Sequence, residues 1–313
     1  MKTSFARLVS ILIRSYFRYF PLATGKVVIW NRIVRPYIAW RRIPMIARSK
    51  FRVSFRGDLR DLIHRYLYFF GVWEPGVTGV MRWHLRQGDR IIDIGANVGA
   101  HALLAATLVG TSGRVYAIEA SPSIFQRLLA NIERNGLNQV KPLNVAVTDV
   151  DTVLSVFLHG AENLGATTTV NFEAERRGIA VETQIAGHPL SGILPLDEIL
   201  ASRLIKIDVE GAEWLVLRGM NDVLPKLDDA CIILIEVNQG SLGHFGASLE
   251  TLLGMMKVAG WEALEVQNDY DPAFYLHPST HLVRPLATPR NETLDLLFAR
   301  PAMRSQVLSS HLA

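Results

Sequence analysis

Short apolar segments that alternate with helix-like segments are the feature that most constrains the fold of this chain. Strands buried on both faces read as nearly continuous apolar runs, and the helices between them provide the crossovers of a parallel sheet. The strand-like runs are RIIDIG, RVYAIEA, VKPLNVAV, LIKID, CIILIEV, WEALEV and TLDLLFAR. This pattern predicts an α/β fold with a mostly parallel sheet covered by helices on both faces.

Length and charge divide the chain into unequal parts. A chain of 313 residues that is 49% hydrophobic can form one domain of roughly 200–250 residues plus an appendage. Residues 1–57 hold 13 Lys or Arg and no Asp or Glu, so the remainder is mildly acidic. We therefore predict a basic leader over 1–57, a main domain over 58–300 with a small β insertion near 150–185, and a tail over 301–313.

The first twenty residues of the leader predict an amphipathic helix that ends at Pro21. At 100° per residue, Arg7, Arg14 and Arg18 fall within about 40° of one another. The opposite side carries Phe5, Val9, Leu12, Tyr16 and Phe20. The uncharged stretch is too short to span a bilayer, and no clean signal-peptide cleavage site follows it.

Two interpretations of this helix stay open. It rests on an anionic membrane surface with its aromatic side inserted, or it packs on the main domain or on a second subunit. No nucleic-acid partner is expected, because no recognisable nucleic-acid-binding motif accompanies the basic charge. The single cysteine, Cys231, has no disulfide partner and lies in an apolar run, so we expect a core residue and a reducing compartment. The expected location is cytoplasmic, at the inner membrane face if the helix binds lipid.

The stretch RIIDIGANVGAHALLAA contains four residues that interrupt apolar sequence: Asp93, Gly95, Asn97 and Gly99. They follow the first strand of the predicted sheet and precede its helix. Ligands of open parallel sheets bind at this edge, where glycines let the backbone turn and approach closely. The next strand ends in Glu119, a carboxylate that can accept both hydroxyls of a ribose. The spacing predicts a nucleoside-binding turn.

The residue types in this turn discriminate between two kinds of nucleotide ligand. A dinucleotide requires G-x-G-x-x-G so that its pyrophosphate can sit on the helix N-terminus. Counted from Gly95, this chain has Asn97 in place of the middle glycine, and Asp93 would repel a pyrophosphate. S-adenosylmethionine carries an ammonium and a sulfonium and has no phosphate. The turn therefore favours a cationic nucleoside.

Several blocks of the sequence resemble the FkbM family of class I S-adenosylmethionine-dependent methyltransferases. They are GDRIIDIGANVGAHALLAA, GRVYAIEASPSIFQRLLANIERNGL, LNVAVTD, ENLGATT, LIKIDVEGAEWLVLRG and IEVN, and the likeness covers about residues 60–300. The resemblance implies a Rossmann-like fold with a seven-stranded sheet, S-adenosylmethionine as cofactor, and O-methylation of hydroxyls on sugars, glycolipids or secondary metabolites. It also implies a cofactor site: Asp93, Gly95, Asn97 and Gly99 at the methionine end, Glu119 at the ribose, and Ala120 and Ser121 beside the adenine.

The segment LIKIDVEGAEW places Lys206 and Asp208 on one face of a buried strand. Burying either charge by itself is costly, so we expect the two to neutralise each other or a neighbouring group at the strand's carboxyl end. Methyl transfer to a hydroxyl requires a group that takes up the hydroxyl proton. Asp208 is the preferred base, with Lys206 tuning it or holding the acceptor, and His101 is the competing base. Glu213 has a simpler explanation as an acid at a helix N-terminus.

Other polar residues follow the strand ends and are expected to bind the acceptor. Glu236 and Asn238 end the next strand, and with Asp208 they could alternatively hold Mg²⁺. No metal is expected, because FkbM members are not generally regarded as metal enzymes. The remaining acceptor candidates are Glu74 in the VWEP turn, Asn163 and Thr167 in a predicted lid, and Glu210. Trp73 and Trp214 either wall the acceptor or pack in the core.

The sequence thus predicts an S-adenosylmethionine-dependent methyltransferase acting on a small-molecule or glycan acceptor. A non-catalytic nucleotide-binding or membrane-adaptor protein that retains the fold is the alternative. A dehydrogenase is disfavoured by the missing glycine. No oligomeric state follows from the sequence.

Overall fold

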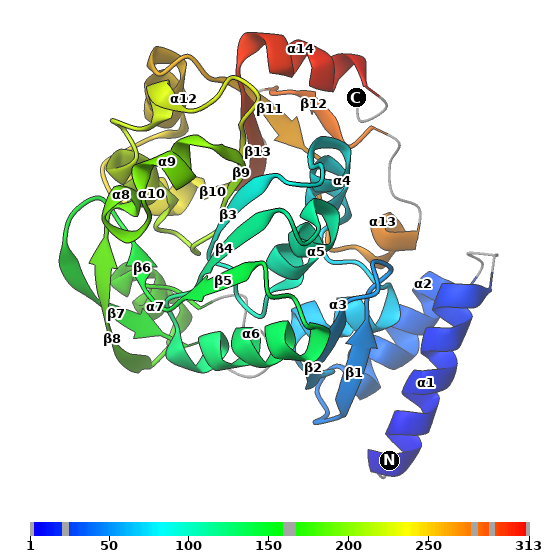
Figure 1. The fold of residues 1–313 in the computed structure, drawn as a ribbon. Coiled ribbons are helices and arrows are strands. Elements are labelled where there is room, and N and C mark those ends of the chain that lie inside the picture. The colour runs from blue at the N-terminus through cyan, green and yellow to red at the C-terminus, as the bar shows by residue number, and fades with distance from the viewer. Residues whose placement is uncertain (1–2, 21–24, 159–166, 277–280, 288–291, 311–313) are drawn as a thin grey trace.

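The computed structural model describes residues 3–20, 25–158, 167–276, 281–287 and 292–310 (Figure 1). Within them, the largest sheet has eight strands in the order β12-β11-β13-β10-β9-β3-β4-β5. The bounds are β3 (Arg90–Ile94), β4 (Arg114–Ile118), β5 (Val140–Leu143), β9 (Ser202–Ile207), β10 (Ile232–Asn238), β11 (Glu262–Val266), β12 (Val283–Pro285) and β13 (Thr293–Ala299).

Five adjacent strands of this sheet, from β5 to β10, run parallel, and the strand order reverses between β3 and β9. Strand β13 lies antiparallel between β10 and β11. This topology confirms the predicted Rossmann-like class I methyltransferase fold. The sheet has one strand more than the expected seven, because β12 pairs antiparallel with β11 at the edge.

Helices cover both faces of the sheet, as Figure 1 shows. Adjacent residues of a strand point to opposite faces, so Ile91 and Ile92, both fully buried, enter two separate cores. The first core packs under α4 (Pro75–His84), α5 (Ala100–Val109) and α6 (Pro122–Asn135). The second packs under α8 (Leu190–Ile193), α9 (Leu196–Leu200), α10 (Glu213–Gly219), η3 (Leu224–Lys226), α11 (Gln239–His244) and α12 (Leu249–Val258).

The N-terminal residues form helices and a hairpin that pack on the first core. Their bounds are α1 (Thr3–Tyr19), α2 (Lys26–Ile29), η1 (Trp30–Ile38), β1 (Pro44–Arg48), β2 (Ser54–Asp58) and α3 (Leu62–Phe69). Strand β2 is tied to α6, since Ser54 and Arg56 donate backbone hydrogen bonds to Asn135 and Asn131. The domain boundary proposed after residue 57 therefore falls inside a strand that packs on the main domain.

The predicted β insertion is confirmed as a separate sheet of order β6-β8-β7. It contains β6 (Ala146–Val147), β7 (Thr152–Phe157) and β8 (Val181–His188), with α7 (Asn171–Arg177) between the last two. The run VKPLNVAV, predicted as one strand, is divided: β5 ends in the large sheet and β6 begins the small one. The backbone changes sheets at Asn144, whose side-chain amide donates to the carbonyl oxygens of Glu119 and Ala120.

In the described C-terminal residues, two further helices follow, α13 (Pro272–Leu276) and α14 (Pro301–Ser309). The segment predicted as a C-terminal tail includes α14, which packs on β11, β12 and β13 and buries Met303 and Val307. Among the helices of the described segments, none combines the length and apolar character needed to cross a bilayer.

Candidate active site

The turn after β3 has a backbone that only particular residues adopt. Gly95, Asn97 and Gly99 all have left-handed φ values, of 83°, 50° and 91°. At Gly95 a Cβ atom would lie 1.7 Å from the Asp208 carbonyl oxygen, so any side chain there would force β3 and β9 apart. Gly95 thus allows the ends of these two strands to meet, and Asp208 N donates to Ile94 O at 3.0 Å.

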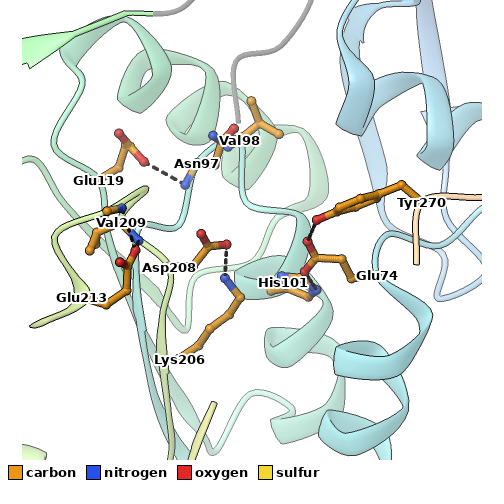
Figure 2. A network of polar contacts seen from close by, with 11 residues as sticks. Glu74, Asn97, Val98, His101, Glu119, Lys206, Asp208, Val209, Glu213 and Tyr270 are labelled. Atoms are coloured by element: carbon orange, nitrogen blue, oxygen red, sulfur yellow. Dashed lines mark hydrogen bonds and ion pairs between the residues drawn. The ribbon is translucent and has the colours of Figure 1, made fainter. Parts of the chain in front are cut away.

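Glu119, at the end of β4, is held by the same turn. Its Oε2 accepts a hydrogen bond from Asn97 N at 2.9 Å (Figure 2). Its Oε1 accepts one from Ser121 N at 2.8 Å. Burial raises the pKa of Glu119 to about 7, although both backbone N–H groups oppose the rise. The carboxyl is therefore poised to ionise near neutral pH.

A cavity of about 210 Å³ opens at the carboxyl ends of β3, β4, β9 and β10. It follows the rule that ligands of open α/β sheets bind where the strand order reverses. The first wall of the cavity comes from the turn after β3 and the end of β4: Asp93, Gly95, Ala96, Asn97, Glu119 and Ala120. The second wall comes from other elements and includes apolar residues such as Leu62, Ile63 and Val147. Its charged and titratable residues are Glu74, His101, Lys206, Asp208, Glu210, Glu236 and Tyr270.

Lys206 and Asp208 form the predicted ion pair, with Nζ 2.7 Å from Oδ2. Burial opposes the Lys206 charge, but Asp208, Asp93 and Glu74 outweigh it and raise the pKa of Lys206 above its usual value. The pair lies between the Asn97–Glu119 contact and the Glu74–Tyr270 contact in Figure 2. It therefore places a fixed cation and a carboxylate at the centre of the site.

Asp93 is 2% exposed and lines the cavity, and neither of its carboxylate oxygens has a hydrogen-bond partner among the described residues. It lies beside Lys206 in the parallel register of β3 and β9. Burial raises the pKa of Asp93 to about 6, and the nearby Lys206 charge opposes that rise. A buried acceptor without a donor fits a ligand that brings a cation or an N–H group.

Glu74, just before α4, is also buried and has a left-handed backbone, with φ 42° and ψ 80°. Tyr270 donates its hydroxyl to Glu74 Oε1 at 2.7 Å, and Glu74 Oε2 lies 3.6 Å from His101 Nε2. Burial raises the pKa of Glu74 to about 8, and burial with the Lys206 charge lowers the pKa of His101 well below its usual value. Burial therefore favours the neutral forms of both Glu74 and His101.

Comparison with known protein families identifies the family to which this chain belongs. The model described as "Methyltransferase FkbM domain" matches residues 93–263, which include both the turn after β3 and the Lys206–Asp208 strand. The chain belongs to the FkbM methyltransferase family. This confirms the resemblance deduced from the sequence motifs.

Relatives with curated names are also methyltransferases. The hexuronic acid methyltransferase AglP of Haloferax volcanii is 28% identical over 200 residues, covering 64% of this FkbM chain and 76% of the relative. A probable cobalt-precorrin-6B C(15)-methyltransferase of Sulfolobus acidocaldarius is 28% identical over 138 residues, covering 42% and 65%.

Solved structures show weaker similarity. A putative rRNA methylase from Clostridium thermocellum has a TM-score of 0.39 and 10% identity, covering 71% of this chain and 92% of that one. TYW2 of M. jannaschii, in complex with AdoMet, has a TM-score of 0.40 and 14% identity, covering 83% and 88%.

This FkbM methyltransferase uses S-adenosylmethionine, as the resemblance implied. The residues of the first wall fit that cofactor. Asp93 is a buried acid without a hydrogen-bond donor, and Glu119 is a carboxyl fixed by two backbone N–H groups. The cofactor is a cationic nucleoside, so it supplies both the positive charge and the hydroxyl donors that these groups lack.

Two titratable residues of the FkbM site, Tyr270 and Asp295, were not singled out from the sequence. Tyr270 lies between β11 and α13, stacks on Trp73 with ring centroids 5.3 Å apart, and carries no motif. Asp295 lies on β13 opposite Glu236 of β10. An acid inside the apolar run TLDLLFAR is the same signal that identified Lys206 and Asp208 in LIKID, and it could have found Asp295.

Glu236 and Asp295 form an acidic pair behind Lys206 and Asp208. Burial, with the nearby Asp208 charge, raises the pKa of Glu236 well above its usual value and that of Asp295 to about 7. The two acids line a second, small cavity together with Glu74, Lys206 and Asp208. In the described parts of the chain, no three His, Cys, Asp or Glu side chains gather closely enough to hold a metal ion.

The other predicted residues fall in different places. Thr167, Glu210 and Trp73 line the cavity. Asn238 instead caps α11, accepting a hydrogen bond from Ser241 N at 3.0 Å, and Ser121 caps α6 with its hydroxyl. Neither capping residue is among the described residues that line the cavity. Asn163 lies outside the described residues.

The structure places Glu213 and Trp214 in structural positions. Glu213 Oε1 accepts backbone hydrogen bonds from Val209 at 3.1 Å and from Gly211 at 2.9 Å. It therefore holds the turn that carries Glu210. Trp214 is buried in the second hydrophobic core.

Proposed function

We propose that this enzyme transfers the methyl group of S-adenosylmethionine to a hydroxyl oxygen of a sugar, glycolipid or secondary metabolite. The observation that carries the proposal is the Lys206–Asp208 ion pair, which lies in the same cavity as the turn after β3. The similarity of this chain to a hexuronic acid methyltransferase supports a sugar acceptor.

The first wall of the cavity is proposed to bind the cofactor. Asp93 would hold the ammonium of the methionine end, with Gly95, Asn97 and Gly99 shaping the turn around it. Glu119 would accept the ribose hydroxyls. Ala120 lines the cavity beside the proposed adenine edge, and Ser121 fixes that edge by capping α6. When bound, the cofactor supplies an electrophilic methyl group.

The second wall is proposed to bind and activate the acceptor. Methyl transfer is an in-line displacement, so the acceptor oxygen must be held in line and must lose its proton. We assign proton removal to Asp208, while Lys206 fixes the Asp208 carboxylate and attracts the oxygen as negative charge develops. His101 is the competing base, because its buried Nε2 belongs to a neutral ring that lines the cavity.

The surrounding acids suit a hydroxyl-rich acceptor. Carboxyl oxygens accept hydrogen bonds from hydroxyl groups, and Glu74, Glu210 and Glu236 line the cavity around the ion pair. Thr167 adds a hydroxyl from the segment beside the small sheet. We propose these four residues as acceptor contacts, with Asn163 as a further candidate from the sequence, whereas Asn238 caps α11.

The test uses S-adenosylmethionine carrying a deuterated methyl group, a panel of uronic acids, neutral sugars and glycolipid extracts, and fragmentation mass spectrometry of the products. We expect the label on an oxygen of a hydroxylated acceptor, and loss of transfer in Asp208→Asn. Label on nitrogen or carbon would overturn O-methylation. Cofactor binding without transfer to any fraction of a cell lysate would favour the alternative, a non-catalytic adaptor that retains the fold.

We further propose that the enzyme works in the cytoplasm as a peripheral protein of the inner membrane face. The acid-free, basic residues 1–57 support this location, because the surface of that leaflet carries anionic lipids. A glycolipid acceptor would be presented at such a surface.

A further inference from the structure

Helix α1 packs on the rest of the protein through one narrow stripe. Ala6, Ser10, Ile13 and Phe17, spaced three or four residues apart, are buried. The Phe17 ring lies 6.0 Å from that of Phe69 on α3, measured between centroids. Figure 1 shows α1 at the edge of the molecule. This stripe accounts for about one side of the helix.

The arginines of α1 flank this buried stripe and partly turn back toward the protein. The Arg18 guanidinium donates hydrogen bonds to the carbonyl oxygens of Arg48 and Leu67. The Arg14 guanidinium lies over the Tyr68 ring, 5.0 Å from its centroid. These two positive charges are thus used to dock the helix rather than to present a uniformly basic face to solvent.

The side of α1 that faces away from the protein is apolar. Phe5, Leu8, Leu12 and Tyr19 are 57%, 54%, 62% and 79% exposed. At 100° per residue these four side chains fall within an arc of about 60°, which we call the α1 apolar row. Large exposed apolar side chains that gather on one side of a helix mark an interaction surface, whereas singly scattered ones do not.

A second set of exposed apolar residues follows on the neighbouring element. Ile33, Tyr37 and Trp40, on η1 and the turn after it, are spaced four and three residues apart and are 37%, 58% and 71% exposed. Helix α1 and η1 are in contact. Tyr and Trp are enriched where proteins meet the headgroup region of a bilayer.

We propose that the α1 apolar row inserts into the headgroup–acyl boundary of an anionic membrane and anchors the enzyme there. This inference rests on the proposed peripheral location and specifies the surface that makes the contact. Charge favours a bilayer over a second copy of the chain. Residues 1–57 carry 13 basic residues and no acid, so pairing two such regions would oppose like charges, whereas anionic lipid complements them.

The exposed basic residues of the same region support this choice. Arg7, Arg32, Arg35, Arg42, Arg48 and Lys50 are all exposed. Apolar insertion and attraction to anionic headgroups add together in interfacial helices, so binding should depend on both. The α1 apolar row distinguishes this mode from purely electrostatic adsorption, which would be insensitive to Leu8 and Leu12.

The experiment is flotation of the full-length chain with vesicles of phosphatidylcholine alone or mixed with phosphatidylglycerol. The test variant is Leu8→Glu with Leu12→Glu, and the matched control is Val150→Glu with Val258→Glu. The control adds the same two negative charges, at two exposed valines outside the leader. We expect wild type and control to float with the anionic vesicles, and the test variant to lose about tenfold or more in apparent affinity. Thermal unfolding and cofactor calorimetry show that each variant is folded.

Two results would overturn the inference: wild type that does not float with anionic vesicles, or a test variant that floats as well as wild type. If no form floats, light scattering is decisive for the alternative, a dimer that the test variant alone has lost. The last result would assign the row to contact between copies. Failure is separable from failure of the proposed function: methylation of a hydroxyl without flotation refutes only the membrane anchor, and flotation without methylation refutes only the proposed reaction.

Discussion

Lys206 Nζ lies 2.7 Å from Asp208 Oδ2, while the backbone of Lys206 is in register with Asp93 on the neighbouring strand. One buried cation therefore stands between Asp93, the acid proposed to bind the cofactor, and Asp208, the acid proposed to act on the acceptor. The close approach of β3 and β9 that produces this arrangement depends on Gly95, where a side chain would strike the Asp208 carbonyl oxygen.

Replacing Lys206 with Met should destabilise the protein, because it leaves buried acids without their neighbouring cation. We expect the free energy of unfolding to fall by about 3 kcal/mol, at the low end for breaking buried pairs since Asp208 is partly exposed. Urea unfolding at pH 7 measures the loss. The double variant Lys206→Met with Asp208→Asn should recover part of it, and a single variant as stable as wild type would contradict the assigned ion pair.

Cofactor affinity should rise between pH 6 and pH 8. Burial raises the pKa of Glu119 to about 7, so the cofactor-free protein loses the Glu119 proton across this range. The ionised carboxylate is the better acceptor for ribose hydroxyls and the better neighbour for a cation, and binding should release up to about one proton. Calorimetry in buffers of different ionisation enthalpy measures this release. In Glu119→Gln the pH dependence above about 7 should largely disappear, while the part due to Asp93, with its pKa of about 6, should remain.

The raised pKa of Glu119 affects protein stability in the opposite direction from cofactor affinity: stability falls as pH rises. The folded protein holds the Glu119 proton to about pH 7, whereas the unfolded chain loses it near its ordinary pKa of 4.5. Stability of the cofactor-free protein should therefore decline as pH rises from about 4.5 to 7. Thermal unfolding of wild type against Glu119→Gln tests this, and a flat difference across that window would contradict it.

Replacing Asp93 with Ala should weaken S-adenosylmethionine binding about tenfold to a hundredfold, the range expected for one lost hydrogen bond to a charged group. The Asp93 carboxylate has no close hydrogen-bond donor in the described part of the chain, which costs stability, but it also neutralises the buried Lys206 charge. Since these effects oppose each other, the variant should stay close to wild type in stability. Calorimetry and thermal unfolding measure the two effects. Unchanged affinity in a folded variant would remove Asp93 from the cofactor site.

The two candidate bases make different predictions. Asp208→Asn should lower kcat by about a hundredfold or more with little change in cofactor affinity, as for loss of a general base. His101→Gln should have a smaller effect on kcat if His101 only lines the acceptor. Burial and the Lys206 charge keep the pKa of His101 well below its usual value, so no histidine titration should appear in the rate above pH 6. Full turnover in Asp208→Asn would transfer the role to His101.

The variant Asn238→Ala tests whether Asn238 only caps α11 or also contacts the acceptor. Its side chain accepts from Ser241 N and donates to Thr293 Oγ1 at 3.0 Å. Loss of the cap should lower the free energy of unfolding by about 1 kcal/mol, with kcat and acceptor KM unchanged. A raised acceptor KM at unchanged stability would return Asn238 to the acceptor site.

The strands of the large sheet and the cofactor turn could be predicted because their signals are local. Asp93 and Asp208 interrupt apolar runs at strand ends, and burial of a charge in such a run is costly enough to be informative. Tyr270 could not be found in this way, since it reaches the site from a loop near the end of the chain and only the fold brings it to Glu74.

The remaining differences have similar physical causes. Asn238 and Ser121 sit at strand ends like the site residues, yet their side chains cap the helices that follow. The division of VKPLNVAV between two sheets depends on pairing with residues 181–188, which no local pattern encodes. The orientation of α1 also required the structure, because two of its sides are apolar and the pattern does not say which one the protein covers.

One acid on β8 links the small sheet to the start of α6. Glu182 accepts a hydrogen bond from the Ser121 hydroxyl at 2.6 Å and one from Ser123 N at 3.0 Å, both at the start of α6. An exchange of this sheet between relatives, as a route to new acceptors, would consequently have to keep an acid at position 182. Without that acid, the exchanged sheet would loosen the start of α6 beside the proposed adenine edge. A change meant to alter the acceptor would then also weaken binding of S-adenosylmethionine.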